Sequence, residues 1–389
     1  MAKKEPVLLP QPPYRTVPES TRRIMRTQLV MLMLPAAAAV VFFGYHALKL
    51  MMVAVLTAII AEAISKKIVF AKMPGSMTHS VMMGLLVAFL LPPQAHWYVA
   101  AVGALIAVGI AKHLFGGIGY YIWHPALAGR LAVQILFGKQ FSSQFGPLLA
   151  RENMILGNIN NVPPVPSVPS ESVDWIHVDW FTSSPPGGWD GFMLARPEEI
   201  WRLLEIRLDA LGVPQIGQFM MEKLPSLEHC LLGAVPGGIG QTCVMALILV
   251  GLFLIYRGYT PWQLPVVFLA GAYIGAVILP IVVKLENNGT NMIFWPFFAE
   301  NIPVGITYLN YILCSGGLFF GAMVVTGDST SRPATVSGQV IFGIGAGFLT
   351  MLFRLYSQIS IPCISAILLM NSLVPLIDGM TCPKGPLRE

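Results

Sequence analysis

The stretch from residue 115 to residue 127 combines three glycines with an aromatic run and a histidine. Its sequence is FGGIGYYIWHPAL, and Gly116, Gly117 and Gly119 fall within four residues. Glycine allows a backbone to turn sharply or to lie against a flat ligand, and the imidazole of His124 can titrate near neutral pH. The stretch could therefore line a ligand site. It could equally be a close contact between helices with a buried, hydrogen-bonded histidine.

A second glycine tetrad, from Gly237 to Gly240, repeats the pattern before another apolar run. Two such turns in an apolar chain are typical of paired halves whose broken helices surround a binding site. Packing of helices through small residues is the alternative explanation for either turn. The candidate binding residues in and beside the two turns are Gly116, Gly117, Gly119, His124, Gly238, Gly240 and Thr242.

Two acidic residues outside these turns also have a chemical interpretation. Glu62 lies in an apolar run, and an ionisable group at membrane depth indicates a functional site by default. It is four residues from Lys66, so a paired or snorkelling carboxylate is the alternative. Asp328 precedes Ser329, Thr330 and Ser331, and it could cap the following helix or face another protein of a complex.

Metal and disulfide chemistry have little support in the sequence. The five cysteines are scattered without a Cys-x-x-Cys pair, which argues against a disulfide framework or a zinc site. An iron–sulfur cluster held by this chain alone would require four thiolates. We therefore predict no metal site. The net charge of +5 is small and gives no reason to expect a nucleic-acid partner.

The composition places these residues in a membrane protein. Of the 389 residues, 55% are hydrophobic and 11% are charged, whereas a soluble domain has about 25% charged residues. The fold class we predict is an all-α polytopic membrane protein of about ten transmembrane helices in two pseudo-symmetric five-helix halves. The ten apolar runs are approximately 29–45, 47–65, 79–93, 97–113, 121–137, 241–256, 262–283, 303–326, 337–353 and 359–377.

The distribution of lysine and arginine predicts the orientation, because cytoplasmic connections carry more of both. The bias places both termini inside and the long polar segment outside. The predicted domains are a cytoplasmic tail (1–28), a first half (29–137), an extracytoplasmic segment (138–231), a second half (232–377) and a cytoplasmic tail (378–389). The N-terminus has no apolar core followed by a small-residue cleavage site, so we predict no cleavable signal peptide.

Four stretches of the chain resemble the RnfD/NqrB family of membrane subunits, in the family's order. They are PESTRRIM at 18–25, LLPP at 90–93 with KHLFGGIG at 112–119 and HPAL at 124–127, VPGGIGQT at 235–242, and ILLMNSLVPLID at 367–378. This family belongs to the Rnf and Na⁺-translocating NADH:quinone reductase complexes. The length and the lack of an N-terminal extension are more similar to the RnfD branch.

The resemblance implies a subunit of an ion-translocating electron-transport complex in the bacterial inner membrane. Electrons would pass between ferredoxin or NAD(H)-type carriers while Na⁺ or H⁺ moves, and other membrane and peripheral subunits would be partners. The implied cofactor is FMN, joined through its phosphate to a threonine, with riboflavin or a second non-covalent flavin as a further expectation. The alternative is a transporter or channel subunit of the same fold without a covalent flavin.

The chain departs from the family at the flavin attachment motif, which is usually Ser/Thr-Gly-Ala-Thr. The nearest match is the sequence VDWFTSSP at 178–185. Thr182 or Ser184 could carry the flavin, or these hydroxyls could form a turn before the prolines. Two other departures are His124 where the family has asparagine, and Gln241 where it has glutamate. At 325–328 the chain has Val-Thr-Gly-Asp in place of Ala-Thr-Asp-Pro.

Overall fold

The computed structural model describes a chain that is mostly helical. The described residues are 21–68, 77–93, 95–114, 116–142, 227–233, 238–284, 291–295, 297–298, 301–315, 317–357 and 362–382. The predicted attachment residues Thr182 and Ser184 lie outside these ranges, as do Gly237 and most of the predicted extracytoplasmic segment.

The first half consists of helices α1 to α4 with one π-helical segment. Helix α1 spans Thr21–Ile68 and α2 spans Met77–Phe89. Helix α3 (Trp97–Leu105) continues into the π-helix η1 (Ile106–Lys112), and α4 spans Pro125–Ser142. Every apolar run that the sequence predicts for this half contains helix, although α1 begins earlier and α4 ends later than the runs.

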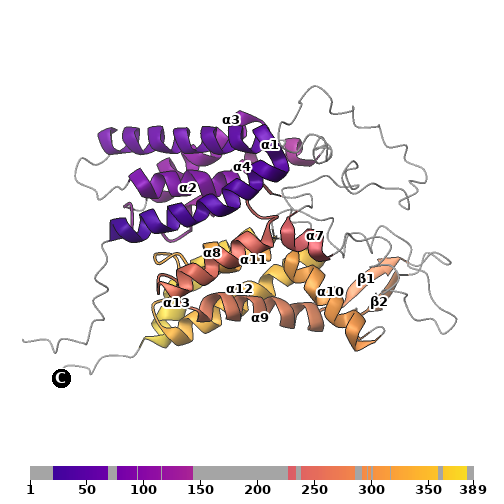
Figure 1. Ribbon diagram of the computed structural model, residues 1–389. Coiled ribbons are helices and arrows are strands. Elements are labelled where there is room, and N and C mark those ends of the chain that lie inside the picture. The colour runs from indigo at the N-terminus through magenta and orange to yellow at the C-terminus, as the bar shows by residue number, and fades with distance from the viewer. Residues whose placement is uncertain are drawn as a thin grey trace, which may run out of the picture.

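Helix α1 contains two arms rather than one rod. Gly44 has φ 64° and ψ −145° inside it, a conformation found almost only in glycine. The helix has 48 residues, about 70 Å of helix at about 1.5 Å per residue, which is twice the thickness of a bilayer core. Figure 1 shows that the chain folds back in the middle of α1, so both ends of α1 lie on the same side of the molecule. The arms correspond to the predicted runs 29–45 and 47–65.

The second half begins with α7 (Leu227–Leu232), α8 (Val244–Tyr256) and α9 (Gln263–Ile278). Helix α10 (Ile302–Cys314) is followed by the short α11 (Leu318–Phe320) and the π-helix η5 (Gly321–Val325). Helices α12 (Val336–Tyr356) and α13 (Pro362–Thr381) complete it. In Figure 1 this orange and yellow half lies below the indigo and purple half.

A short β-hairpin departs from the all-α prediction. Strand β1 (Ile281–Lys284) pairs antiparallel with β2 (Asn291–Phe294), with Ile281 opposite Phe294. The hairpin begins inside the apolar run predicted at 262–283, because helix α9 ends at Ile278 and Pro280 cannot donate the next helical hydrogen bond.

Several helices have membrane character. Among the described residues, three are individually long and apolar enough to cross a bilayer: α1, α12 and α13. Helix α10 with α11 and η5 qualifies as a fourth if this bent pair forms one span, and five further apolar helices have 10–17 residues. Large apolar side chains are exposed on the outer faces, including Val30, Leu249 and Val266 at 53–66%. Helices that carry apolar side chains on the outer face as well as on the face toward the protein core are typical of proteins in lipid.

Small residues set the distance between neighbouring helices within each half. A Cβ atom at Gly84 of α2 would lie 2.7 Å from the Ala54 carbonyl oxygen of α1. A Cβ at Gly129 of α4 would lie 2.5 Å from the Gly103 carbonyl oxygen of α3, and Gly347 of α12 is similarly close to the backbone of α9. Close backbone approach through small residues is how helices associate in lipid.

Candidate functional site

A fully buried carboxylate lies between the helices of the first half. Glu62, in the second arm of α1, has 0% exposure. Its Oε2 accepts hydrogen bonds from the Lys112 ammonium at 2.7 Å and from the Ser80 hydroxyl at 2.8 Å. The Ser80 hydroxyl in turn accepts from Lys112 at 2.8 Å. Three elements, α1, α2 and η1, therefore each supply one side chain to a closed triangle of hydrogen bonds.

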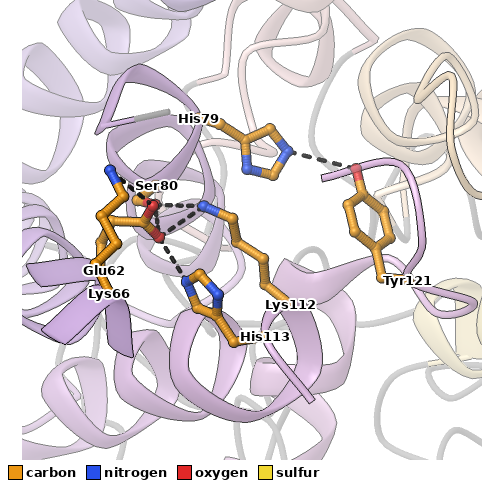
Figure 2. Close-up of polar contacts among 7 residues, drawn as sticks. All are labelled: Glu62, Lys66, His79, Ser80, Lys112, His113 and Tyr121. Atoms are coloured by element: carbon orange, nitrogen blue, oxygen red, sulfur yellow. Dashed lines mark hydrogen bonds and ion pairs between the residues drawn. The ribbon is translucent and has the colours of Figure 1, made fainter. Parts of the chain in front are cut away.

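Two further nitrogen groups face the same carboxylate. His113 Nε2 donates to Glu62 Oε2 at 2.7 Å, and Lys66 lies 3.4 Å from Oε1, one helical turn along α1. Figure 2 shows all of these groups converging on Glu62. The pairing with Lys66 that the sequence suggested is confirmed, whereas snorkelling is wrong because Glu62 does not reach the surface. We call Glu62, Lys66, Ser80, Lys112 and His113 the Glu62 cluster.

A second polar group connects the two halves of the molecule. The Tyr121 hydroxyl, in the loop before α4, donates to the Asp328 carboxylate at 3.0 and 3.1 Å. Asp328 follows η5 in the second half, and its Oδ2 also accepts from Ser331 at 3.1 Å. His79 Nε2 lies 3.4 Å from the Tyr121 oxygen. The tyrosine therefore bridges α2 of the first half and the loop after η5 of the second.

Both π-helical segments end at these polar groups. η1 ends at Lys112, and η5 ends three residues before Asp328. A π-helical turn inserts a residue into a helix and is frequent at functional sites. Lys112, the last residue of η1, faces Glu62 of α1.

His124 lies buried at the start of α4, with 2% exposure. The Asn371 side-chain amide is oriented so that both its oxygen and its nitrogen have hydrogen-bond partners. The amide oxygen accepts from the His124 backbone N–H at 3.3 Å, and the amide nitrogen donates to the Ser331 carbonyl at 3.0 Å. The neighbouring Trp123 indole donates to Ser372 at 2.7 Å. Helix α13 therefore holds the loop before α4 in place. The Asn371 amide is a site residue that the sequence analysis did not single out, although it lies in the ILLMNSLVPLID stretch.

The first glycine turn lies beside the Glu62 cluster. Gly116, Gly117 and Gly119 have φ of 112°, 94° and 94°, which is the left-handed region that favours glycine. The Gly117 N–H donates to the Lys112 carbonyl at 3.0 Å and so closes the end of η1. A Cβ at Gly119 would meet no atom within 4 Å. This turn is open on that side.

The second glycine turn lies away from the Glu62 cluster, and neighbouring atoms fill the space beside Gly240. Ile239 N–H donates to the Leu91 carbonyl at 3.0 Å and Gly240 N–H to the Phe89 carbonyl at 3.1 Å, which places the turn at the C-terminal end of α2. A Cβ at Gly240 would overlap the Phe89 ring. Ser80 and Phe89 are about 14 Å apart along α2, so the two turns do not form one site. Gly238 and Thr242 belong to this second location, and both are buried.

Two buried arginines satisfy carbonyl groups where helices end. Arg130 Nε donates to the Leu90 carbonyl at 2.9 Å, just beyond α2. Arg354 donates to the Ile312 carbonyl at 3.2 Å and to Ser315 at the end of α10. Irregular backbone at membrane depth persists only where protein groups satisfy it, so both arginines stabilise helix breaks. Arg130 lies inside the apolar run predicted at 121–137, and Arg354 directly follows the run at 337–353. A charged residue within or next to an apolar run is the sequence signal that could have indicated them.

Asp328 does not cap α12, although the sequence suggested capping of the following helix as one of its roles. The residue that caps α12 is Thr335, whose hydroxyl accepts from Gly338 N–H at 3.0 Å. Asp328 is therefore not the cap. In the loop after η5, burial lowers the pKa of the Arg332 guanidinium, and the nearby Asp328 carboxylate opposes that shift.

No group of three or more histidine, cysteine or acidic side chains within the described ranges could hold a metal ion.

Fold and site together define a helical membrane protein with a buried cluster of ionisable groups and polar contacts between its halves. The chain belongs to the NQR2, RnfD, RnfE family, whose model matches residues 9–385.

Individual relatives match the chain over nearly its whole length. It is similar, with 31% identity over 98% of this chain and 96% of the relative, to the D subunit of the proton-translocating ferredoxin:NAD(+) oxidoreductase complex of Clostridium ljungdahlii. Over 95% of this chain and 92% of the relative, it is 28% identical to the D subunit of the Na(+)-translocating ferredoxin:NAD(+) oxidoreductase complex of Acetobacterium woodii. It is 29% identical to the D subunit of the ion-translocating oxidoreductase complex of Yersinia pestis, over 96% of both chains.

Proposed function

We propose that this chain is the D-type membrane subunit of an ion-translocating electron-transfer complex. The observation that carries the proposal is the Glu62 cluster, in a chain that relatives named as D subunits match almost from end to end. An ionisable group inside a membrane protein costs free energy and persists where it serves an ion or proton path. Lys112 and Glu62 are both fully buried and paired at 2.7 Å.

The topology that we propose has ten spans with both termini in the cytoplasm. It is supported by helix in each of the ten apolar runs and by the two arms of α1. The predicted cytoplasmic ends also meet in space, because Lys112 and Asp328 lie in neighbouring polar groups. The membrane would be the bacterial inner membrane. Cysteine labelling of segment 138–231 from the outside is the measurement that decides this orientation.

Partner subunits are part of the proposal, because each relative is named as one subunit of a complex. Electrons would move between ferredoxin and NAD⁺ as the names of two relatives state, with H⁺ or Na⁺ crossing the membrane. The alternative, a transporter or channel subunit of the same fold, would act without such partners.

We expect the affinity-tagged chain to co-purify with several membrane and peripheral subunits from its native membrane. Membrane vesicles should then couple reduction of NAD⁺ by reduced ferredoxin to ion movement, and deletion of this chain should abolish both. A tagged protein that purifies alone and transports an ion without electron transfer would refute the proposal and favour the channel alternative. Deletion of an unrelated membrane protein is the control.

Flavin binding is the cofactor proposal, and the two glycine turns differ in how well they fit a flavin. In the second turn, the Phe89 ring fills the space beside Gly240, and Gly238 and Thr242 are buried. The first turn is open beside Gly119, which could lie against a flat ring, whereas Tyr120 packs beside Gly116. A bound flavin would supply one-electron transfer. FMN esterified to Thr182 or Ser184 is the covalent form that we propose.

A phosphoester bond survives denaturation, so the denatured chain should fluoresce as a gel band under ultraviolet light. Thr182→Ala, or failing that Ser184→Ala, should remove the fluorescence completely without reducing the amount of protein. Ser183→Ala, between the two, is the matched control and should stay fluorescent. A dark wild-type band, from cells that attach flavin to another protein, would exclude covalent FMN in this chain.

A further inference from the structure

The hydroxyl of Tyr121 makes hydrogen bonds on both sides of the boundary between the two halves. Tyr121 is 2% exposed and lies in a loop of the first half, while Asp328 belongs to the second. A phenol has one proton to donate, and the Asp328 carboxylate is acceptor-only when ionised. The Tyr121 proton is therefore directed to Asp328. His79 must consequently donate its own Nε2–H to the Tyr121 oxygen.

This assignment leaves the other nitrogen of His79 as an unprotonated acceptor. His79 is 2% exposed, and its Nδ1 has no hydrogen-bond partner among the described residues. A buried polar atom without a partner costs about 1–3 kcal/mol and calls for an explanation. Charges that act on this ring include those of Lys112, Asp328, His124 and Glu62. In the view of Figure 2, the ring lies between the Lys112 ammonium and Tyr121.

We propose that His79, Tyr121 and Asp328 form a proton relay between the two halves of this protein. The inference rests on the proposed function, because it assigns a route to the ion that the complex moves. His79 Nδ1 is the entry point, and it belongs to the residue next to Ser80 of the Glu62 cluster. Asp328 is the exit point, and it faces Ser331 and Arg332 in the second half.

The transfer step conserves atoms and charge. A proton that binds Nδ1 makes His79 an imidazolium. Its Nε2 proton then moves to the Tyr121 oxygen as the Tyr121 proton moves to Asp328. The products are a neutral imidazole, an unchanged phenol and a protonated carboxyl group, so one positive charge has crossed to the second half. Release of the Asp328 proton, rotation of the Tyr121 hydroxyl and return of the His79 tautomer restore the starting state.

The geometry disfavours a Na⁺ ion at the Glu62 cluster, beside the entry point of this route. A hard cation requires several oxygen ligands, but Glu62 is surrounded by the ammonium groups of Lys66 and Lys112 and by the imidazole of His113. The 3.4 Å between His79 and Tyr121 closes to an ordinary hydrogen bond with a shift of a few tenths of an ångström.

The test is Tyr121→Phe in the whole complex, in sealed vesicles and Na⁺-free buffer. The variant removes only the hydroxyl oxygen, and its assembly is checked by co-purification of the other subunits. We expect proton uptake driven by reduced ferredoxin to fall about 100-fold, the scale of losing a positioned proton-transfer group. Electron transfer to NAD⁺, measured with a protonophore present, should remain. Tyr273→Phe, on the half-exposed face of α9, is the matched control.

His79→Gln is the second variant, because its amide can still donate to Tyr121 but cannot pass a proton through a ring. It should lose proton uptake as Tyr121→Phe does. Wild-type proton uptake in either assembled variant would overturn the relay, and so would transport that requires Na⁺ in the wild-type vesicles. Absence of ferredoxin-driven electron transfer in the wild-type complex would instead refute the proposed function, so the two failures are distinguishable.

Discussion

Replacement of Lys112 by methionine is expected to destabilise the protein by about 3–5 kcal/mol, because removing one partner of a buried ion pair leaves the other charge uncompensated. The ammonium of Lys112 is fully buried and donates to both Glu62 and Ser80. Methionine keeps most of the length of the side chain and removes the charge. We expect little of the variant to reach the assembled complex, measured as the fraction of this chain that co-purifies with its partners.

The double variant Glu62→Gln/Lys112→Met should recover assembly, because a neutral pair of similar volume avoids the cost of a lone buried charge. Lys66→Met is the matched control. Lys66 contacts the same carboxylate at 3.4 Å but its side chain is 33% exposed, and such pairs contribute about 0–1 kcal/mol. If Lys112→Met assembles as well as Lys66→Met, the buried pair is not what holds α1 against η1.

The second glycine turn should not tolerate a side chain at Gly240. A methyl group at Gly240 would lie 2.5 Å from Cβ of Phe89, which is itself fully buried at the end of α2. Gly240→Ala should therefore cost at least about 1–3 kcal/mol by overpacking, and it should also disturb the two backbone hydrogen bonds that the turn makes with the end of α2 and the residues after it. The measurement is the yield of monodisperse protein in detergent and its melting temperature.

The double variant Gly240→Ala/Phe89→Ala tests the mechanism, because it removes the ring that the new methyl group meets. The double variant should lose less free energy of unfolding than the two single variants lose together, because the two residues are in contact. Gly109→Ala is the control, because a Cβ there would meet nothing within 4 Å. A Gly240→Ala protein with the yield and melting temperature of Gly109→Ala would show that this turn needs glycine for some other reason, such as a ligand.

Local sequence patterns predicted much of the helical fold. Apolar runs marked where helices lie, and the four-residue spacing of Glu62 and Lys66 predicted their pairing, because both depend on neighbours along one helix. The β-hairpin at 281–294 was missed, since a short apolar stretch after a helix does not by itself distinguish a strand from a continued span. The number of spans and the symmetry of the halves stay predictions.

The candidate site was predicted less completely, because its contacts join distant residues. Glu62 is 50 residues from Lys112, and Tyr121 is 207 residues from Asp328. No spacing along the chain indicates such pairs. The π-helical turn that ends at Lys112 has no sequence signature of its own either. The two glycine tetrads look alike as sequence, yet one is open and the other filled, because Phe89 packs against only the second.

The buried Glu62–Lys112 pair has a consequence for biogenesis. A charged side chain that meets lipid without a partner costs free energy, and neither side chain of this pair has any exposure in the folded chain. If the second arm of α1 left the translocon alone, only Lys66 on the same arm, 3.4 Å from the carboxylate and 33% exposed, could offset the charge of Glu62. The segment that carries both members of the fully buried pair extends to Lys112, so we expect α1, α2, α3 and η1 to be released together as one inserting unit.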